Sequence, residues 1–345
     1  MPFKKNLDKN IWAKSDEISK ADLSRFMLDL FLGETCNLHC KHCYFGEQKP
    51  ISSLLNYKQW VAIINDFLDY GCRHFHISGK ESLLTPHTSD IMEYLNMSKK
   101  KYRDIFWGII TNGTSLRFDQ YNKILDSHIN YMEISLDGHE CIHDYIRGIG
   151  TYNKVINTLS KLHNLSKINI SYTINKLNSK DLKKVLRHLY DLGIRKFYCS
   201  PMQIKGMAIR NNIPLITSNH YIEVIEDIKE YVYNNFQNTN IRFSIPHTCV
   251  EYMLKVELYS NDILEYFKTG KPIYWNINSN IIELSLHTIS IPLFTQASIT
   301  SDGHILPSSD RVEERCSLGI YDGISGFMKA RKTSILKYFS TDERI

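Results

Sequence analysis

Six short apolar runs, each followed by a stretch of helical periodicity, constrain the fold of this chain more than any other feature. The runs are Met27–Leu32, His74–Ser78, Ile105–Thr111, Tyr131–Leu136, Ile168–Thr173 and Lys196–Ser200. Between the first two, Trp60, Ile63, Ile64, Phe67 and Leu68 recur at helical spacing, and we expect further helices over 85–97, 117–126 and 179–191. Such alternation is typical of β/α units around a parallel sheet. The predicted fold class is therefore α/β.

The pattern changes after Pro201. In order along the chain we expect a helix over 218–237, a short strand over 241–244, a helix over 248–268 and a last helix over 325–339. The stretch 280–306 is rich in Ile, Leu, Ser and Thr, and Ser301–His304 has the composition of a hairpin turn. These signals predict a small β-hairpin module packed on the end of the main domain.

The composition excludes several classes of protein. The chain has 345 residues, of which 43% are hydrophobic and 23% charged, so disordered, collagen-like and coiled-coil chains are excluded. A net charge of +5, from 42 Lys and Arg against 37 Asp and Glu, is too dilute to indicate nucleic acid. No run reaches the roughly 18 apolar residues of a membrane helix. The polar start, Met1–Asn10, lacks the apolar core of a secretion signal. We therefore expect a cytoplasmic protein with reduced cysteines and no membrane partner.

Three of the eight cysteines, Cys36, Cys40 and Cys43, fall within eight residues with the spacing C-x3-C-x2-C. Three thiolates this close can surround one metal centre, and soft thiolates suit an iron–sulfur cluster or zinc. Zinc would take His39 or His42 as its fourth ligand. Structural zinc sites usually use two cysteine pairs, and no second pair occurs here. The spacing favours iron and sulfur, and three ligands to a four-iron cube leave one iron without a protein ligand.

Polar or glycine-containing segments follow every predicted strand. After the cysteine segment they are Ser78–Glu81, Thr111–Gly113, Ser135–Gly138, the pair Asn175 and Asn178, and Cys199–Pro201. All lie at the carboxyl ends of their strands, where parallel sheets and barrels place their sites. The sequence thus predicts one site at that edge of the sheet.

The cysteine segment resembles the signature of the radical SAM superfamily, CxxxCxxC with an aromatic residue before the third Cys, a position that His42 occupies here. The resemblance covers about residues 27–201, the family's partial (β/α)6 barrel, and extends more loosely to about 320. It implies one [4Fe-4S] cluster held by Cys36, Cys40 and Cys43, with S-adenosylmethionine (SAM) on the open iron. It also implies a flavodoxin- or ferredoxin-type electron donor and a 5′-deoxyadenosyl radical that abstracts a substrate hydrogen.

Further segments resemble SAM-binding motifs of the same family. Ser78, Gly79, Lys80 and Glu81 are similar to the GGEP segment that meets the SAM amino group, although Lys80 replaces the second Gly and Ser82 replaces Pro. A glycine lets carbonyls approach an ammonium and a carboxylate can pair with it, whereas the alternative is a plain strand-to-helix turn. Ser135 and Arg147, in a segment resembling SLDG…HdxxRg, would bind the SAM carboxylate, or else be a capping Ser and a surface Arg. Asn112 would lie near the ribose or form an Asx turn.

The C-terminal part resembles the SPASM and twitch appendages, which normally carry auxiliary clusters. Where their proline–cysteine pair is usual, this chain has Pro307-Ser308, and 293–298 contains no Cys. We therefore expect a twitch-like appendage with no auxiliary cluster, and a redox-neutral outcome such as epimerisation. Candidate thiol hydrogen donors are Cys316, Cys249 and Cys199, each of which could instead be a buried apolar residue.

These expectations combine into one interpretation. The predicted divisions are an N-terminal extension (1–25), a radical SAM partial barrel (26–205), a helical bridging region (206–285) and a twitch-like hairpin with a C-terminal helix (286–345). The predicted function is a radical SAM enzyme that modifies a ribosomally made peptide, because motif neighbours act on peptides. Alternatives are an aminoglycoside or nucleotide-sugar substrate, or a non-catalytic metal-stabilised binding protein.

Overall fold

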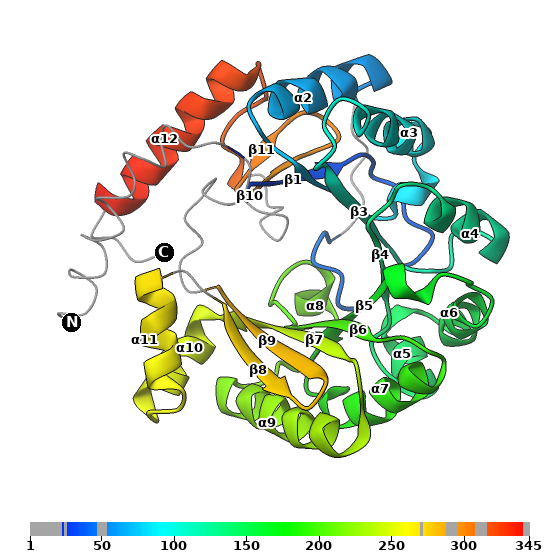
Figure 1. Cartoon of the computed structure of the whole chain (residues 1–345), viewed down its shortest axis with the longest axis vertical. Helices are drawn as coiled ribbons and strands as arrows, with labels where there is room; N and C mark the ends of the chain where they lie inside the picture. The colour runs from blue at the N-terminus through cyan, green and yellow to red at the C-terminus, as the bar shows by residue number, and fades with distance from the viewer. Residues whose placement is uncertain are drawn as a thin grey trace.

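A single eleven-stranded sheet organises the molecule, in the order β11-β10-β1-β2-β3-β4-β5-β6-β7-β9-β8. The structure, a computed structural model, describes residues 23, 26–46, 54–269, 272–287, 296–307 and 316–340. All neighbouring strands pair in parallel except the β10–β11 and β8–β9 pairs at the two edges. The sheet curves without closing, as Figure 1 shows. The fold is therefore α/β, a partial barrel, and this prediction is confirmed.

The strands follow the predicted runs closely over the first 200 residues. Their bounds are β1 Met27–Phe31, β2 His74–Ser78, β3 Phe106–Thr111, β4 Tyr131–Ser135, β5 Ile168–Ile174, β6 Lys196–Pro201, β7 Asn240–Pro246, β8 Ile273–Ile277, β9 Asn280–His287, β10 Gln296–Ile299 and β11 Ile305–Leu306.

Helices cover the convex side of the sheet (Figure 1). The longer ones are α2 Tyr57–Asp69, α3 Thr88–Ser98, α4 Phe118–Asp126, α5 Glu140–Arg147, α6 Thr151–Leu159, α7 Leu182–Asp191, α9 Ser218–Asn235, α10 His247–Lys255, α11 Ser260–Thr269 and α12 Ile324–Ser340; α8 is a single turn, Met207–Arg210. Helix α2 begins with a capping box, in which Asn56 and Gln59 satisfy each other's backbone N–H groups. Its predicted apolar face, from Trp60 to Leu68, is buried.

The two faces of the sheet differ in polarity. Strand β5 alternates strictly, with Ile168, Ile170, Tyr172 and Ile174 buried and the polar residues between them partly exposed. The buried set belongs to one large apolar core beneath the helices. The concave face carries the polar residues, so side chains of successive strands can meet there and at the carboxyl edge.

The C-terminal third of the chain supplies both edges of the sheet, which the sequence did not predict. The expected turn at 301–304 forms, because Thr300 N–H donates to His304 O and the short strands β10 and β11 pair around it. However, β10 pairs in parallel with β1, and β9 pairs in parallel with β7. The stretch 280–306 is therefore divided between opposite edges instead of forming one separate hairpin module.

Region 206–285 contains three strands as well as helices. The expected helix over 248–268 is two helices, α10 and α11, separated by Glu257 and Tyr259, whose φ angles are positive (58° and 54°). Strand β7 continues the sheet from β6 without a break. The description of this region as a helical bridge is therefore incomplete, and the division into domains stays a prediction. The expected extension 1–25 lies outside the described residues, apart from residue 23.

Candidate functional site

The three clustered cysteines lie on the loop after β1, which we call the cysteine loop (residues 35–46). All three side chains are partly exposed and none is in a disulfide. Burial raises the pKa of Cys40 to about 11, Arg147 opposes that shift, and Cys43 and Cys36 add to it. The pKa of Cys36 is also raised, chiefly by burial, with a contribution from Cys43. The three sulfurs are thus electrostatic neighbours, as their sequence spacing predicts.

Nitrogen donors point at two of these sulfurs. The backbone N–H of Leu38 lies 3.4 Å from Cys36 Sγ, Asn112 Nδ2 lies 3.9 Å from the same sulfur, and Arg147 Nη1 lies 4.0 Å from Cys40 Sγ. Donors to sulfur stabilise thiolates and tune iron–sulfur clusters. In the described part of the chain no three His, Cys, Asp or Glu side chains are gathered as a ready single-ion site. The soft donor set and its N–H neighbours fit a thiolate-bound cluster.

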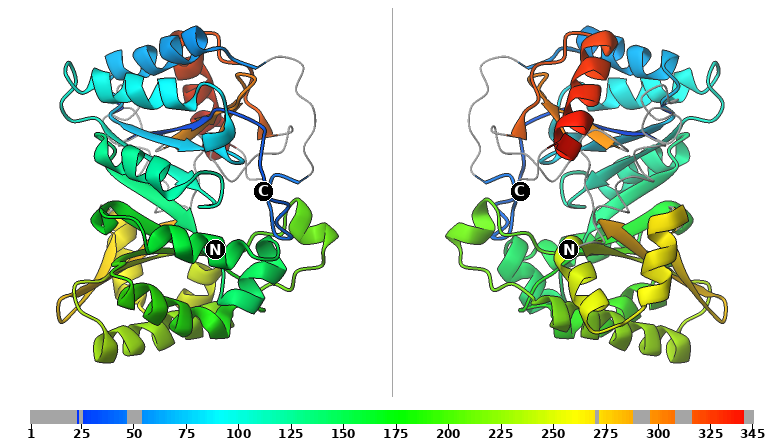
Figure 2. Two further views of the ribbon diagram at one scale, coloured as in Figure 1. Left: turned by 90° about the vertical axis from the view of Figure 1, so that its right-hand side faces the viewer. Right: turned by 90° about the vertical axis from the view of Figure 1, so that its left-hand side faces the viewer.

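Two other segments hold the cysteine loop from outside. Met207 N–H, at the start of α8, donates to Cys43 O (2.8 Å), and Asn211 Nδ2 donates to Lys41 O (3.1 Å). On the other side, Lys41 N–H donates to Ile146 O of α5 (2.8 Å). Figure 2 shows the blue loop beside α8 in both side views. The loop's course is thus fixed by backbone contacts with segments more than 100 residues away.

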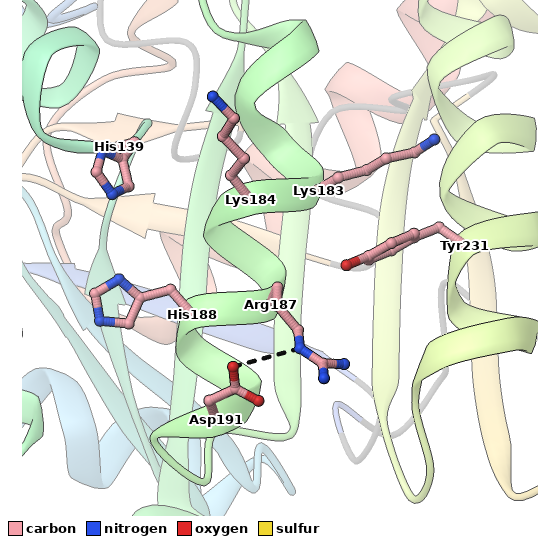
Figure 3. Close-up of a pocket in the computed structure, with 7 residues that line it drawn as sticks. All are labelled: His139, Lys183, Lys184, Arg187, His188, Asp191 and Tyr231. Atoms are coloured by element: carbon pink, nitrogen blue, oxygen red, sulfur yellow. Dashed lines mark ion pairs between the residues drawn. The ribbon is translucent and has the colours of Figure 1, made fainter.

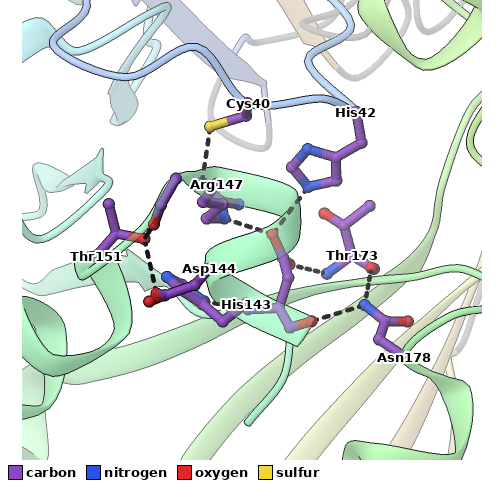
Figure 4. A network of polar contacts seen from close by, with 10 residues as sticks. Cys40, His42, His143, Asp144, Arg147, Thr151, Thr173 and Asn178 are labelled. Carbon is purple, nitrogen blue, oxygen red and sulfur yellow. Dashed lines mark hydrogen bonds and ion pairs between the residues drawn. The ribbon is translucent and has the colours of Figure 1, made fainter. Parts of the chain in front are cut away.

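Asp137, two residues after the end of β4, is the centre of a buried polar network, and Figure 4 labels its partners His42, Arg147 and Thr173. Its side chain is fully buried. Oδ2 accepts hydrogen bonds from His42 Nε2 (2.8 Å) and Arg147 Nε, and Oδ1 accepts from Thr173 N–H (2.7 Å). Burial alone would raise the pKa of Asp137. Arg147 and His42 outweigh that effect and hold the pKa well below its usual range. A buried carboxylate therefore links the cysteine loop to β4, β5 and α5.

His143 and Asn178 complete this network. Asp137 N–H donates to His143 Nδ1 (3.1 Å), and Asn178 Nδ2 donates to Asp137 O (2.9 Å). Burial and Arg147 lower the pKa of His143 to about 4, so its ring is neutral at pH 7. Asp137 lies in a predicted motif segment and Asn178 follows a predicted strand, but the sequence predicted no role for Asp137 or His143. A signal existed, since both lie in the segment that carries Ser135 and Arg147.

His42 is held by Asp137. Its Nδ1 is buried and has no hydrogen-bond partner among the described residues. His42 thus bonds to a carboxylate through one ring nitrogen, and the other has no partner within the part of the chain that the structure describes.

Glu81 lies fully buried after β2, and its carboxylate points toward the loop after β3. Oε1 accepts from Thr111 Oγ1 (2.7 Å) and Ser115 Oγ (3.0 Å), and Oε2 accepts from Asn112 N–H (2.7 Å). Burial raises the pKa of Glu81 despite these hydrogen bonds. The carboxylate therefore already ties two site loops together, beside any contact with a ligand.

Lys80, the main departure from the GGEP pattern, forms an ion pair with Glu34 (2.8 Å) in the segment preceding the cysteine loop. The Lys80 side chain is only 6% exposed. Glu34 also accepts a hydrogen bond from Ser301 Oγ (2.8 Å) in the C-terminal turn. The preceding Gly79 has φ +118°, a conformation that favours glycine, and lies against Phe31 and Gly33. The substitution is thus accommodated by a specific partner.

The remaining predicted cofactor residues lie at the same carboxyl edge. Ser78 closes β2 and donates to Asp29 (3.3 Å), and Ser135 is buried at the end of β4. Asn112 forms the expected Asx turn, since Thr114 N–H donates to its Oδ1 (2.8 Å). Its Nδ2 meanwhile donates to Asn37 Oδ1 (2.8 Å) on the cysteine loop. Asn112 therefore makes the turn and also faces the cysteines.

Two of the three candidate thiol donors are buried in the apolar core. Cys199 is fully buried on the convex face of β6, opposite Tyr172, and Cys249 of α10 is buried in the same core. Burial raises both pKa values. These two positions fit buried apolar residues. Cys316 is partly exposed, while Ser308 lies outside the described residues.

Part of this chain matches one known protein family. The family model of the Radical SAM superfamily matches residues 30–189. Sporulation killing factor maturation protein SkfB of Bacillus subtilis is 25% identical over 168 residues, which are 48% of this chain and 39% of that protein. Pre-heme d1 synthase of Dinoroseobacter shibae is 26% identical over 183 residues, 52% of this chain and 44% of that protein. The matched region thus spans about two-fifths of these curated relatives.

A solved structure has the same fold over nearly the whole chain. Streptococcus suis SuiB bound to precursor peptide SuiA superimposes with a TM-score of 0.66 at 15% identity, covering 99% of this chain and 70% of that one. SuiB has also been solved bound to S-adenosylmethionine.

No helix in the described ranges is long and apolar enough to cross a membrane.

Proposed function

Since the chain carries a radical SAM domain, we propose that it cleaves SAM reductively and uses the resulting radical to modify a ribosomally made peptide. The observation that carries this proposal is the cysteine loop at the carboxyl edge, with Asn112, Arg147 and His42 around it. When bound there, a [4Fe-4S] cluster supplies one electron to SAM, giving a 5′-deoxyadenosyl radical that removes a hydrogen atom from the substrate.

The chain's own residues hold and orient the reactants. Cys36, Cys40 and Cys43 would hold the cluster as thiolates. Arg147, anchored by Asp137, keeps a positive charge beside Cys40, which favours thiolate formation and suits binding of the SAM carboxylate together with Ser135. The Ser78–Glu81 turn would place its carbonyls near the SAM ammonium. Asn112 would orient the nucleoside from the next strand.

A peptide substrate is supported by two relatives. SkfB is named as a maturation protein for a killing factor, and SuiB was solved with its precursor peptide. A small-molecule substrate is the second candidate, favoured by the similarity to Pre-heme d1 synthase. Incubation with a short peptide encoded beside the gene, followed by mass spectrometry, distinguishes them: a mass change in the peptide supports the first candidate.

We further propose a single cluster and a redox-neutral outcome. Cys199 and Cys249 are buried in the core. Cys316 is partly exposed and is therefore the remaining candidate for a thiol that donates hydrogen. In an epimerisation, Cys316 would return a hydrogen atom to the substrate radical, and its thiyl radical would then need one electron and one proton from an external donor. About four irons per chain are expected; about eight would show a second cluster. In deuterated water the product should gain one deuterium.

The decisive experiment is anaerobic reconstitution followed by SAM cleavage. With dithionite, the protein should be brown and yield 5′-deoxyadenosine, and the triple variant Cys36→Ala, Cys40→Ala, Cys43→Ala should lose both properties. Cys141→Ala is the matched control, because Cys141 is exposed and outside the loop. A colourless protein holding one zinc would contradict the proposal.

The free thiols fit a reducing, cytoplasmic setting.

A further inference from the structure

Strand β8 forms one edge of the sheet, and no strand in the described residues pairs with its outer side. The opposite edge, β11, is covered, because Ile305 N–H donates to Gly319 O (2.8 Å) and Leu318 N–H donates to Ile305 O (2.9 Å). We propose that β8 binds the peptide substrate by taking up an extended segment of it as an additional strand. This inference rests on the proposed function and adds a recognition site for the same substrate.

The backbone groups of Tyr274 and Asn276 point away from β9. In an antiparallel pair, residues alternate between those that bond to the partner strand and those that do not. Ile281 lies opposite Asn276, and its N–H donates to Thr239 O (2.8 Å) on the side of β7. Asn276 is therefore not bonded to Ile281, and Tyr274, two residues earlier, has the same orientation. Together the two residues offer two N–H donors and two C=O acceptors to another strand.

Strand β8 lacks the features that usually prevent pairing at an edge. Edge strands are commonly protected by charged residues, proline, a bulge or very short length. The sequence of β8 is IYWNI, with no charge and no proline, and its register with β9 is unbroken over five residues. Strand β11, in contrast, has only two residues. Among the described strands, β8 is therefore the edge suited to pairing with a peptide.

The inner face of β8 is anchored to the helices. The ring of Trp275 lies 4.7 Å from that of Tyr259, and Lys229 Nζ stands 4.1 Å from the centre of the Trp275 ring. Tyr259 OH donates to Glu226 Oε1 (2.6 Å) of α9. Tyr274, on the other face, is 50% exposed. A strand held in this way is already in the conformation that a pairing peptide needs, which lowers the entropic cost of binding.

A peptide paired with β8 would turn every second side chain toward the face of the sheet that carries the candidate site. Tyr274 lies opposite Glu283, and Glu283 lies opposite Arg242, with which it forms an ion pair (3.0 Å). Residues directly opposite each other share a face of the sheet. The same row continues through Tyr198, Ser171 and Ser135. The paired segment would thus extend the concave face on which the predicted SAM residue Ser135 lies.

A groove of about 500 Å³, lined by α7 and by Tyr231 of α9, is less suited to this role (Figure 3). Backbone groups inside a helix are bonded within that helix, so only side chains could contact a peptide there. Arg187 pairs with Asp191 (3.3 Å), as Figure 3 shows, and Lys183 pairs with Asp227. The groove therefore lacks the backbone donors and acceptors that recognise an extended main chain.

Hydrogen exchange in the unaltered protein tests the pairing directly. The probe is the synthetic short peptide encoded beside the gene, and SAM is left out so that the peptide is not converted. NMR follows the amides of β8 with and without saturating peptide. Tyr274 and Asn276 N–H should exchange fast in the free protein and at least about tenfold more slowly with peptide. The amides of Trp275 and Ile277, which face β9, are the internal reference and should be protected in both states.

A proline substitution tests the outward N–H separately. Tyr274→Pro removes this donor without removing a bond to β9, and edge strands tolerate proline. It should raise the Kd of the labelled peptide about tenfold, because a peptide carbonyl loses its donor. Tyr274→Ala, which keeps the N–H, is the matched control and should raise the Kd less than about threefold. Circular dichroism melting shows whether the proline variant is folded, and the exchange experiment does not depend on it.

The outcomes separate this inference from the proposed function. Modification of the peptide without protection of Tyr274 and Asn276 would refute pairing at β8 and leave the proposed function intact. A peptide that is neither bound nor modified would refute both. Protection without peptide would mean that another part of the chain covers β8, or a second copy if the protection rises with protein concentration. Either result would overturn the inference.

Discussion

Gly206 lies against the backbone of Cys43: a Cβ built at Gly206 would stand 2.5 Å from the Cys43 carbonyl oxygen. It would also lie 2.6 Å from Tyr44 O and 2.7 Å from Gly46 N, and Gly206 has φ +51°. The loop after β6 therefore approaches the backbone of the cysteine loop at a position that only glycine can occupy without displacing one of the two loops.

Gly206→Ala should consequently lower iron retention. The added methyl group must displace the cysteine loop or α8, and the strained backbone adds on the order of 1–3 kcal/mol. Iron and sulfide analysis after reconstitution measures the effect. Gly323→Ala is the control, since Gly323 also has positive φ (+116°) but nothing within 4 Å of its Cβ position. Equal iron content in both variants would contradict the supporting role.

Asp137→Asn should destabilise the fold strongly. The change removes the buried charge that Arg147 faces, and an uncompensated buried charge costs about 3–5 kcal/mol. Urea unfolding measures the loss. Asp119→Asn, which breaks the exposed pair with Arg117 (3.0 Å), should cost less than about 1 kcal/mol. Similar losses in both variants would show that the Asp137 network contributes little.

Lys80 and Glu34 should be energetically coupled. The Lys80 side chain is buried, so removing Glu34 leaves a buried ammonium without this carboxylate, whereas removing Lys80 leaves Glu34 with its hydrogen bond from Ser301. A double-mutant cycle with Lys80→Ala and Glu34→Ala should give a coupling energy of about 1–3 kcal/mol. Purely additive effects would mean that the lysine is merely tolerated.

His74 should make stability fall in mild acid. Burial, chiefly, lowers its pKa from 6.5 to about 4, with His76 adding to the shift. The unfolded chain therefore binds a proton as the pH falls below about 6.5, while folded His74 stays neutral until about pH 4. Its contribution to stability is complete above pH 6.5 and lost between 6.5 and 4.

NMR titration of the histidine rings tests this prediction residue by residue. The contribution of His76 to stability should have the opposite pH dependence. Burial acts to lower its pKa, but the hydrogen bond to Asp29 outweighs that effect and raises it. Its contribution is present at low pH and lost as the pH rises through the folded pKa. Replacement His74→Gln should remove the acid-side slope. A His74 pKa at or above 6.5 would refute the argument.

The sequence predicted the first six strands well because buried parallel strands appear as short apolar runs. It predicted β7 as a short strand, but pairing partners are non-local, and nothing local indicates that β10 joins β1 while β9 joins β7. The cysteine loop was recognisable from spacing alone. The Lys80–Glu34 pair and the contact of Gly206 with Cys43 were not, because they join segments far apart in the chain.

The roles within motifs were also harder to predict than the motifs. Glu81 was expected to face a ligand, and its carboxylate is bonded to Thr111, Asn112 and Ser115. Asp137 carried no expected role and forms the centre of the network. Residue identity and spacing indicate which segments meet, whereas the direction of each side chain depends on packing between strands.

The pairing of β10 with β1 sets an order of events during biosynthesis. The strand that precedes the cysteines acquires its second neighbour only after almost 300 residues have been made, and Glu34 acquires Ser301 at the same stage. Such distant pairing is slow to form. A nascent chain therefore carries its three thiols beside an incompletely paired strand until residues 296–299 have been made.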